Sequence, residues 1–112
     1  MEALQPLDSE MDAVIEFLDK HLRPNTSWSI KEEYPLVFES KNFGNVRIIK
    51  EDEKILSHAV SKYLLIKTPV GIFKVAAIGS VVTDPKFRNL GHSQNVLEAT
   101  LDAAKEHGCD FA

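Results

Sequence analysis

Near the N-terminus, apolar and polar residues alternate with the period of an amphipathic helix. Apolar side chains recur at the i, i+3, i+4, i+7 and i+11 positions of one helix face: Met11, Val14, Ile15, Leu18 and Leu22. Ser9 followed by Asp12 forms a capping-box-like start, and Pro24 cannot continue a helix because it lacks the N–H donor. We therefore expect a helix over about residues 9–22, with this face in the core.

The next stretch predicts only short structure. Ser29 followed by Glu32 is a second cap signature, but Pro35 limits any helix there to a turn or two. Residues 40–45 are rich in turn formers, and the hydrophobic pattern changes its period beyond them.

The middle of the chain shows the pattern of extended strands, over about residues 46–50, 55–67 and 72–83. The links at residues 51–54 and 68–71 are short, so an antiparallel meander of three strands is expected. The third strand is almost continuously apolar in its middle, which predicts a central strand covered on both faces. Gly79 within it indicates a β-bulge or a close backbone approach.

A second amphipathic helix is predicted over about residues 93–107, and Gly108 suits its C′ position. Its expected buried face consists of Val96, Leu97, Leu101 and Ala104. Residues 109–112 read as the opening of a further strand. The succession of strand, helix and strand is a βαβ crossover, which places the new strand parallel to the preceding one. We expect one domain over residues 1–112 that stops as this strand begins.

Composition narrows the function classes. The 13 basic and 17 acidic residues give a net charge of −4 and are scattered along the chain, which disfavours a nucleic-acid-binding face. Cys109 is the single cysteine, so no intrachain disulfide forms, and the four histidines show no metal-ligand spacing. The segment from Met1 to Leu4 lacks the basic start of a leader, and no apolar run could span a bilayer. We expect a soluble, cytoplasmic protein with no metal, no nucleic-acid partner and no membrane partner.

The stretch from Val81 to Ser93 places a loop between a buried strand and the N-terminus of a helix. The first turn of a helix has unpaired N–H groups and the positive end of the helix dipole, which together favour an anion. Gly91 lets the backbone approach a phosphate, and Lys86 and Arg88 add positive charge. The spacing of glycines matches neither a Walker loop nor a Rossmann fingerprint, so neither site is expected.

The loop sequence Arg88-Asn89-Leu90-Gly91-His92-Ser93 resembles the Q/R-x-x-G-x-G/A motif of the GCN5-related N-acetyltransferases, the GNAT superfamily. Arg88 and Gly91 match, whereas Ser93 stands where the family prefers glycine or alanine. Its added oxygen either crowds the phosphate or donates a hydrogen bond to it. The preceding strand end is also similar to the V-x-P ending of these enzymes. The resemblance implies that the cofactor binds at these residues: Val81, Val82, Thr83, Arg88, Asn89, Leu90, Gly91, His92 and Ser93.

The resemblance implies an α/β fold of the α+β type. N-terminal helices precede the antiparallel meander and the crossover helix, and the C-terminal strands of the family are missing from this sequence. The implied activity is transfer of an acetyl group from acetyl-CoA, as co-substrate, to a primary amine of a small molecule or peptide. The amine attacks the thioester directly, with no covalent enzyme intermediate.

No catalytic residue is assigned by the sequence. A carboxylate, histidine or ordered water usually serves as base in this family, and His58, Asp84 and Glu51 are the residues to consider. A lone strand histidine is more often packed, however, and turn carboxylates are more often solvated. The tyrosine that often serves as general acid has no counterpart here. The alternative function is a non-catalytic CoA-binding or interaction module completed by a partner chain, including a homo-oligomer formed through an exposed sheet edge.

Overall fold

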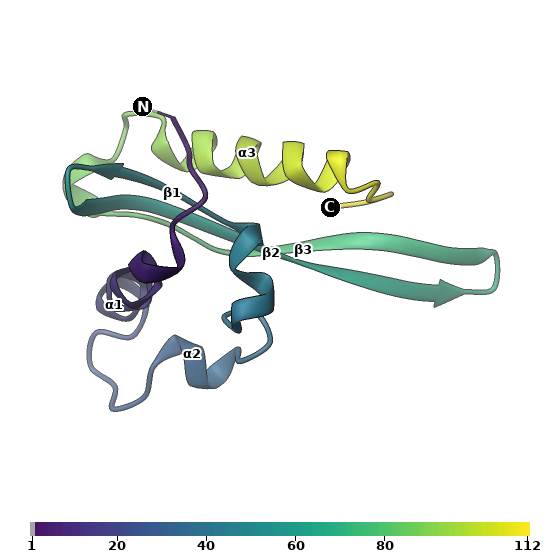
Figure 1. The fold of residues 1–112 in the computed structure, drawn as a ribbon, viewed down its shortest axis with the longest axis horizontal. Coiled ribbons are helices and arrows are strands. Elements are labelled where there is room, and N and C mark those ends of the chain that lie inside the picture. Colours follow the sequence, from purple (N-terminus) through teal and green to yellow (C-terminus); the bar gives the residue numbers. More distant parts are fainter. Residues whose placement is uncertain (1) are drawn as a thin grey trace.

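A computed structural model describes residues 2–112, so Met1, part of the segment considered for a leader, lies outside the described residues. One antiparallel sheet with the order β1-β2-β3 forms the centre of the fold. Its strands are β1 (Val46–Glu51), β2 (Lys54–Thr68) and β3 (Gly71–Thr83). Figure 1 shows α1 and α2 on one side of the sheet and α3 on the other. The predicted α/β architecture, with a three-strand meander followed by a crossover helix, is confirmed.

The N-terminal helix follows the predicted pattern but starts differently. A 3-10 turn, η1 (Asp8–Glu10), leads into α1 (Met11–Leu22). The predicted cap at Ser9 is wrong, because the Glu10 carboxylate accepts a hydrogen bond from the Leu7 N–H at 2.9 Å instead. The predicted face packs as expected, with Ile15 and Leu22 half-buried and the rest buried beside Phe17, which the pattern missed.

The short helix α2 (Ile30–Glu33) forms as the second cap signature predicts. The Ser29 hydroxyl accepts a hydrogen bond from the Lys31 N–H at 3.2 Å. Ile30 is buried against α1 and the sheet. After α2, the chain returns to the sheet through the 3-10 helix η2 (Ser40–Asn45), in the stretch rich in turn formers.

A β-bulge interrupts the pairing of β2 with β3 where Gly79 predicts it. His58 pairs with Val82 and Val60 pairs with Gly79, so Ser80 and Val81 together lie opposite the single residue between His58 and Val60. Ser80 has φ +48°, in the left-handed region that residues other than glycine adopt at a cost. The bulge therefore changes the direction of β3 just before its C-terminal end.

The expectation that β3 is a central strand is wrong. β2 occupies the centre, because it pairs with both neighbours, and β3 is at the edge of the sheet. On its outer side, β3 is contacted by the residues that follow α3. Phe111 forms a parallel bridge to Val75, and the Asp110 N–H donates to the Lys74 carbonyl at 2.7 Å. The Ala76 N–H donates to the Phe111 carbonyl at 2.9 Å. This bridge confirms the parallel direction predicted for the residues after the crossover helix.

The opposite edge of the sheet has a similar bridge that the sequence did not predict. Leu4 and Ile48 form an antiparallel bridge, with both backbone N–H groups donating at 2.8 Å. The N-terminal segment therefore lies along β1.

Gly108 follows the C-cap of the crossover helix α3 (His92–Glu106) and has φ +75°, as its predicted C′ role requires. The buried face of α3 differs from the predicted one. Val96 and Ala104 are buried, but the side chain between them is Thr100, whose hydroxyl donates to the Val96 carbonyl at 2.7 Å. Because that bond satisfies the polar group, the row 96, 100 and 104 can face the sheet, and the two predicted leucines remain exposed: Leu97 and Leu101. Within residues 2–112, no helix combines the length and hydrophobicity needed to cross a bilayer.

Candidate functional site

A cavity of about 470 Å³ lies where the end of β3 meets the start of α3. Of the nine residues predicted to bind the cofactor, eight line it. Leu90 does not line the cavity and is largely exposed to solvent. The full lining is Val81, Val82, Thr83, Phe87, Arg88, Asn89, Gly91, His92, Ser93 and Gln94. Folding therefore gathers the predicted loop residues around one concave space.

The loop before α3 owes its shape to two residues with left-handed backbones. Asn89 has φ +64° and Gly91, at the N-cap of α3, has φ +80°. A side chain at Gly91 would meet no atom within 4 Å, so the backbone angle, rather than crowding within the chain, favours glycine there. The helical hydrogen bond nearest this end runs from the Asn95 N–H to the Gly91 carbonyl. The N–H groups of residues 92–94 precede it, and these are the unpaired donors of a helix start.

The strand end leading into this loop is also held firmly. A 3-10 turn, η3 (Pro85–Phe87), follows Asp84. The buried Asp84 carboxylate accepts a hydrogen bond from the Lys86 N–H at 3.0 Å, and that bond lowers the pKa of Asp84 below its ordinary value. Arg88 is exposed beside the cavity. The negative side chain is thus occupied with its own turn, and the positive one is available to an anion.

Three hydroxyl groups connect the centre of the sheet to the cavity. The Ser57 hydroxyl on β2 lies 2.8 Å from the Thr83 hydroxyl at the end of β3. The Thr83 hydroxyl in turn lies 2.6 Å from the Ser93 hydroxyl in the first turn of α3. Ser57 also donates toward the Val82 carbonyl at 3.1 Å. Ser93, the residue that departs from the family motif, is therefore the outer member of this row.

His92, which lines the same cavity, has an unpaired polar atom in its ring. The side chain is 7% exposed, and its Nδ1 atom is buried without a hydrogen-bond partner among the described residues. Buried polar atoms are rarely left unpaired, because the loss of water costs free energy. A bound water is the partner expected for this buried atom.

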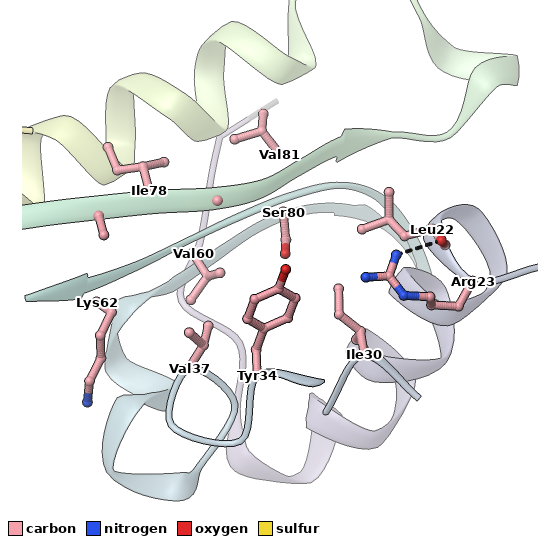
Figure 2. Close-up of a pocket in the computed structure, with 12 residues that line it drawn as sticks. Leu22, Arg23, Ile30, Tyr34, Val37, Val60, Lys62, Ile78, Ser80 and Val81 are labelled. Carbon is pink, nitrogen blue, oxygen red and sulfur yellow. Dashed lines mark hydrogen bonds between the residues drawn. The ribbon is translucent and has the colours of Figure 1, made fainter. Parts of the chain in front are cut away.

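A second cavity, of about 550 Å³, lies on the other side of β3, facing α1 and α2. Its wall at the sheet includes the bulge, and Figure 2 shows the Tyr34 hydroxyl pointing toward Ser80 inside it. Arg23 is held at the rim by Glu33 and by the Leu22 carbonyl. The full lining is Leu22, Arg23, Ile30, Tyr34, Val37, Val60, Lys62, Ala77, Ile78, Gly79, Ser80 and Val81. Val81 lines both cavities, so the two spaces are adjacent across the end of β3.

The three candidate bases lie outside both cavities. His58 is fully buried; its Nδ1 atom lies 2.8 Å from the Ser80 carbonyl, and burial lowers its pKa to about 4. Since a carbonyl only accepts, Nδ1 is the protonated nitrogen of a neutral ring. Asp84 is bonded to its own turn, and Glu51 is exposed next to the β1–β2 turn. His58 therefore holds the bulge by its hydrogen bond and is packed, as the more common interpretation of a strand histidine expects.

Sequence reasoning predicted Thr83 as a site residue but missed the contacts that depend on the strand register. Ser57 and Thr83 are paired across β2 and β3, and the bulge after Gly79 decides which hydroxyls meet. Tyr34 follows a one-turn helix whose position the sequence left uncertain. Among the described residues, no group of three His, Cys, Asp or Glu side chains is arranged to hold a metal ion.

Comparisons with known proteins agree with this geometry. The family model described as Acetyltransferase (GNAT) domain matches residues 5–112. Among curated protein sequences, none matches the chain.

Several solved structures share the fold. A predicted acetyltransferase with acetyl-CoA from Clostridium acetobutylicum superposes with a TM-score of 0.78 at 16% identity, over 99% of this chain and 78% of that one. Glucosamine-6-phosphate N-acetyltransferase from Arabidopsis thaliana gives a TM-score of 0.73 at 23% identity, over 98% and 78%. A transcriptional regulator from Bacillus halodurans gives 0.72 at 17%, over 97% and 77%. At these identities the likeness concerns the fold.

Proposed function

Because this chain belongs to the GNAT acetyltransferase domain family, we propose that it transfers an acetyl group from acetyl-CoA to a primary amine. The observation that carries the proposal is the cavity at the start of α3, which eight of the predicted residues line. A pyrophosphate suits this place, because the helix dipole and Arg88 both favour negative charge.

The proposed binding mode divides the two substrates between the two cavities. The pyrophosphate of acetyl-CoA binds at Gly91 and its neighbours, and the pantetheine arm follows the end of β3 toward Val81. The amine, from a small molecule or a peptide, enters the cavity beside Tyr34 and Ser80 (Figure 2). The two substrates then meet at the bulge, since Val81 borders both spaces.

The reaction proposed is direct attack. The amine nitrogen bonds to the thioester carbon, the carbon–sulfur bond breaks, and the thiolate leaves. Backbone N–H groups near the strand end stabilise the negative charge that develops on the carbonyl oxygen. Among the described residues that line the amine cavity, none is Asp, Glu or His, so we assign the released amine proton to water.

Calorimetry with acetyl-CoA and with CoA tests the site. Arg88→Glu should weaken both ligands at least ten-fold, because an exposed positive charge beside the pyrophosphate becomes negative. Lys41→Glu is the matched control, since Lys41 is exposed on η2 and makes the same change in net charge away from the cavity. Absence of binding by the unchanged protein, or equal effects of the two substitutions, would remove the loop as a cofactor site.

A thiol-release assay with a panel of amines tests the chemistry. Release of CoA that depends on the amine supports transfer. If acetyl-CoA binds but no amine causes release of CoA, the result supports the second candidate, a non-catalytic CoA-binding or interaction module. That candidate is favoured by one observation: β3 is at the edge of the sheet, where Asp110 and Phe111 contact only the short stretch around Val75 among the described residues.

The interaction module predicts association through this edge, with a partner chain or with a second copy of the protein. Sedimentation velocity over a range of concentrations measures it. A monomer at all concentrations with a sharp thermal transition would contradict the module.

A further inference from the structure

The row of hydroxyls at Ser57, Thr83 and Ser93 has a direction, because each hydroxyl has one proton to donate. The row contains three hydrogen bonds, and each needs one donated proton: Ser57 to the Val82 carbonyl, Ser57 with Thr83, and Thr83 with Ser93. A carbonyl can only accept, whereas each hydroxyl can donate once and accept twice. With three hydroxyl protons for three hydrogen bonds, only one arrangement of the protons forms all three bonds.

In that arrangement every proton points inward. Ser57 donates to the Val82 carbonyl, so Thr83 must donate to Ser57, and Ser93 must donate to Thr83. Ser93 then presents only lone pairs to the cavity, and these repel a phosphate oxygen. Ser57 has no exposed surface, so water cannot supply a substitute partner there.

The opposite arrangement turns every proton outward. Ser57 donates to Thr83, Thr83 donates to Ser93, and the Ser93 proton is free to point into the cavity. The contact that is lost is the one from Ser57 to the Val82 carbonyl, which at 3.1 Å is the longest of the three. A hydrogen bond to a charged oxygen is stronger than a bond between neutral groups, so an anion in the cavity favours this direction.

We propose that the hydroxyl row reverses when the pyrophosphate binds, so that Ser93 donates to it and the buried Ser57 sets how readily Ser93 does so. This inference rests on the proposed function. Ser93 contacts the ligand, whereas Ser57 is a positioning residue that acts through Thr83. The departure of Ser93 from the family motif becomes an added donor rather than an obstruction.

The two serines are predicted to have opposite effects. Ser93→Ala removes the donor and should weaken CoA binding about ten-fold, the surplus of a charged hydrogen bond over the neutral one given up. Ser57→Ala removes the inward arrangement, because Thr83 then donates only to Ser93. It should tighten CoA binding about three-fold. A buried serine with a merely structural role would leave CoA affinity unchanged or weaken it.

Calorimetry of the single variants and the double variant provides the test, with CoA and with pantetheine, which lacks the pyrophosphate. The tightening by Ser57→Ala should disappear in the Ser93→Ala background, and pantetheine should respond to neither change. Ser27→Ala, on an exposed loop residue, is the control, and thermal unfolding verifies that each variant is folded. Ser93→Thr keeps a hydroxyl and should bind CoA better than Ser93→Ala.

The outcomes separate the two proposals. If the unchanged protein binds CoA and Ser93→Ala binds it equally well, the reversal is wrong and the cofactor site stands. If Ser57→Ala weakens CoA binding in both backgrounds, the coupling through Thr83 is wrong. If the unchanged protein does not bind CoA, both proposals are wrong.

Discussion

Lowering the pH should destabilise this protein through His58. The ring is fully buried on β2, its Nδ1–H donates to the Ser80 carbonyl at 2.8 Å, and its Nε2 atom has no partner among the described residues. Protonation would place a charge and an unpaired N–H in the interior. Burial is the main cause that lowers the pKa of His58 from 6.5 to about 4, and the hydrogen bond to Ser80 opposes it.

The magnitude follows from the two pKa values. In the unfolded chain, the histidine takes up its proton near its ordinary pKa of 6.5, whereas in the folded protein it does so near 4. Between these values the unfolded state binds more protons, so the free energy of unfolding falls as the pH falls. The loss from this residue is negligible above pH 7, about 2 kcal/mol at pH 5 and about 3 kcal/mol below pH 4. Such a loss is a large part of the stability of a typical domain.

Urea unfolding followed by circular dichroism at pH 7 and pH 5 measures this loss, with His58→Asn as the comparison. The asparagine side-chain N–H can occupy the place of Nδ1–H, but the amide does not titrate. The variant is less stable at pH 7 because it is smaller, yet it should lose about 2 kcal/mol less than the unchanged protein between the two pH values.

Comparing the unchanged protein with His58→Asn cancels the effects of the other titrating groups. The pKa of Glu10 is lowered by its hydrogen bond from Lys50, and that of Asp84 by the Lys86 N–H, but both carboxylates are present in both proteins. Their effects therefore cancel in the difference. Equal losses of stability in the two proteins would refute the argument that His58 is buried and neutral.

Two further predictions concern backbone angles at the site. Gly91→Ala should lower the free energy of unfolding by about 1 kcal/mol, the cost of φ +80° for alanine, and should also weaken CoA binding, because a methyl group then faces the pyrophosphate. Thermal unfolding and calorimetry measure the two effects, and unchanged affinity would place the phosphates elsewhere. Ser80→Gly should raise the free energy of unfolding by up to about 1 kcal/mol in urea unfolding, since glycine adopts φ +48° without strain. A loss of stability would show that the Ser80 side chain contributes more than its backbone costs.

The parts of the fold predicted from the sequence are those fixed by local pattern. The helix period around Val14 and Leu18, the turn residues before Gly71 and the C′ role of Gly108 each depend on neighbours within a few positions. The meander was predicted correctly but the place of β3 in the sheet was not, because its apolar run has the composition of a central strand and yet lies at an edge. The buried face of α3 was also missed, since hydrophobicity favours Leu97 over Thr100, whose hydroxyl is satisfied by its own helix.

In the candidate site, too, the part formed by contiguous residues was predicted and the part assembled from distant residues was not. The loop from Arg88 to Ser93 is contiguous, so its motif identifies it directly, and its gathering around one cavity needs only a strand followed by a helix. The amine cavity combines α1, α2 and both longer strands, and its wall at Ser80 exists only because of the bulge. Such long-range positions depend on register, which local patterns in one sequence do not determine.

The bridges of Leu4 and Phe111 have a practical consequence for handling the protein. Among the described residues, Leu4 covers part of one border of the sheet, and Asp110 and Phe111 cover part of the other. The remaining length of each border can therefore pair with a neighbouring molecule. If the segment around Leu4 or the segment around Phe111 detached, more of the sheet edge would be exposed. Aggregation on heating should begin at that edge. Amide exchange at Ile48 and Ala76, whose N–H groups these two bridges protect, would report that detachment before any turbidity is visible.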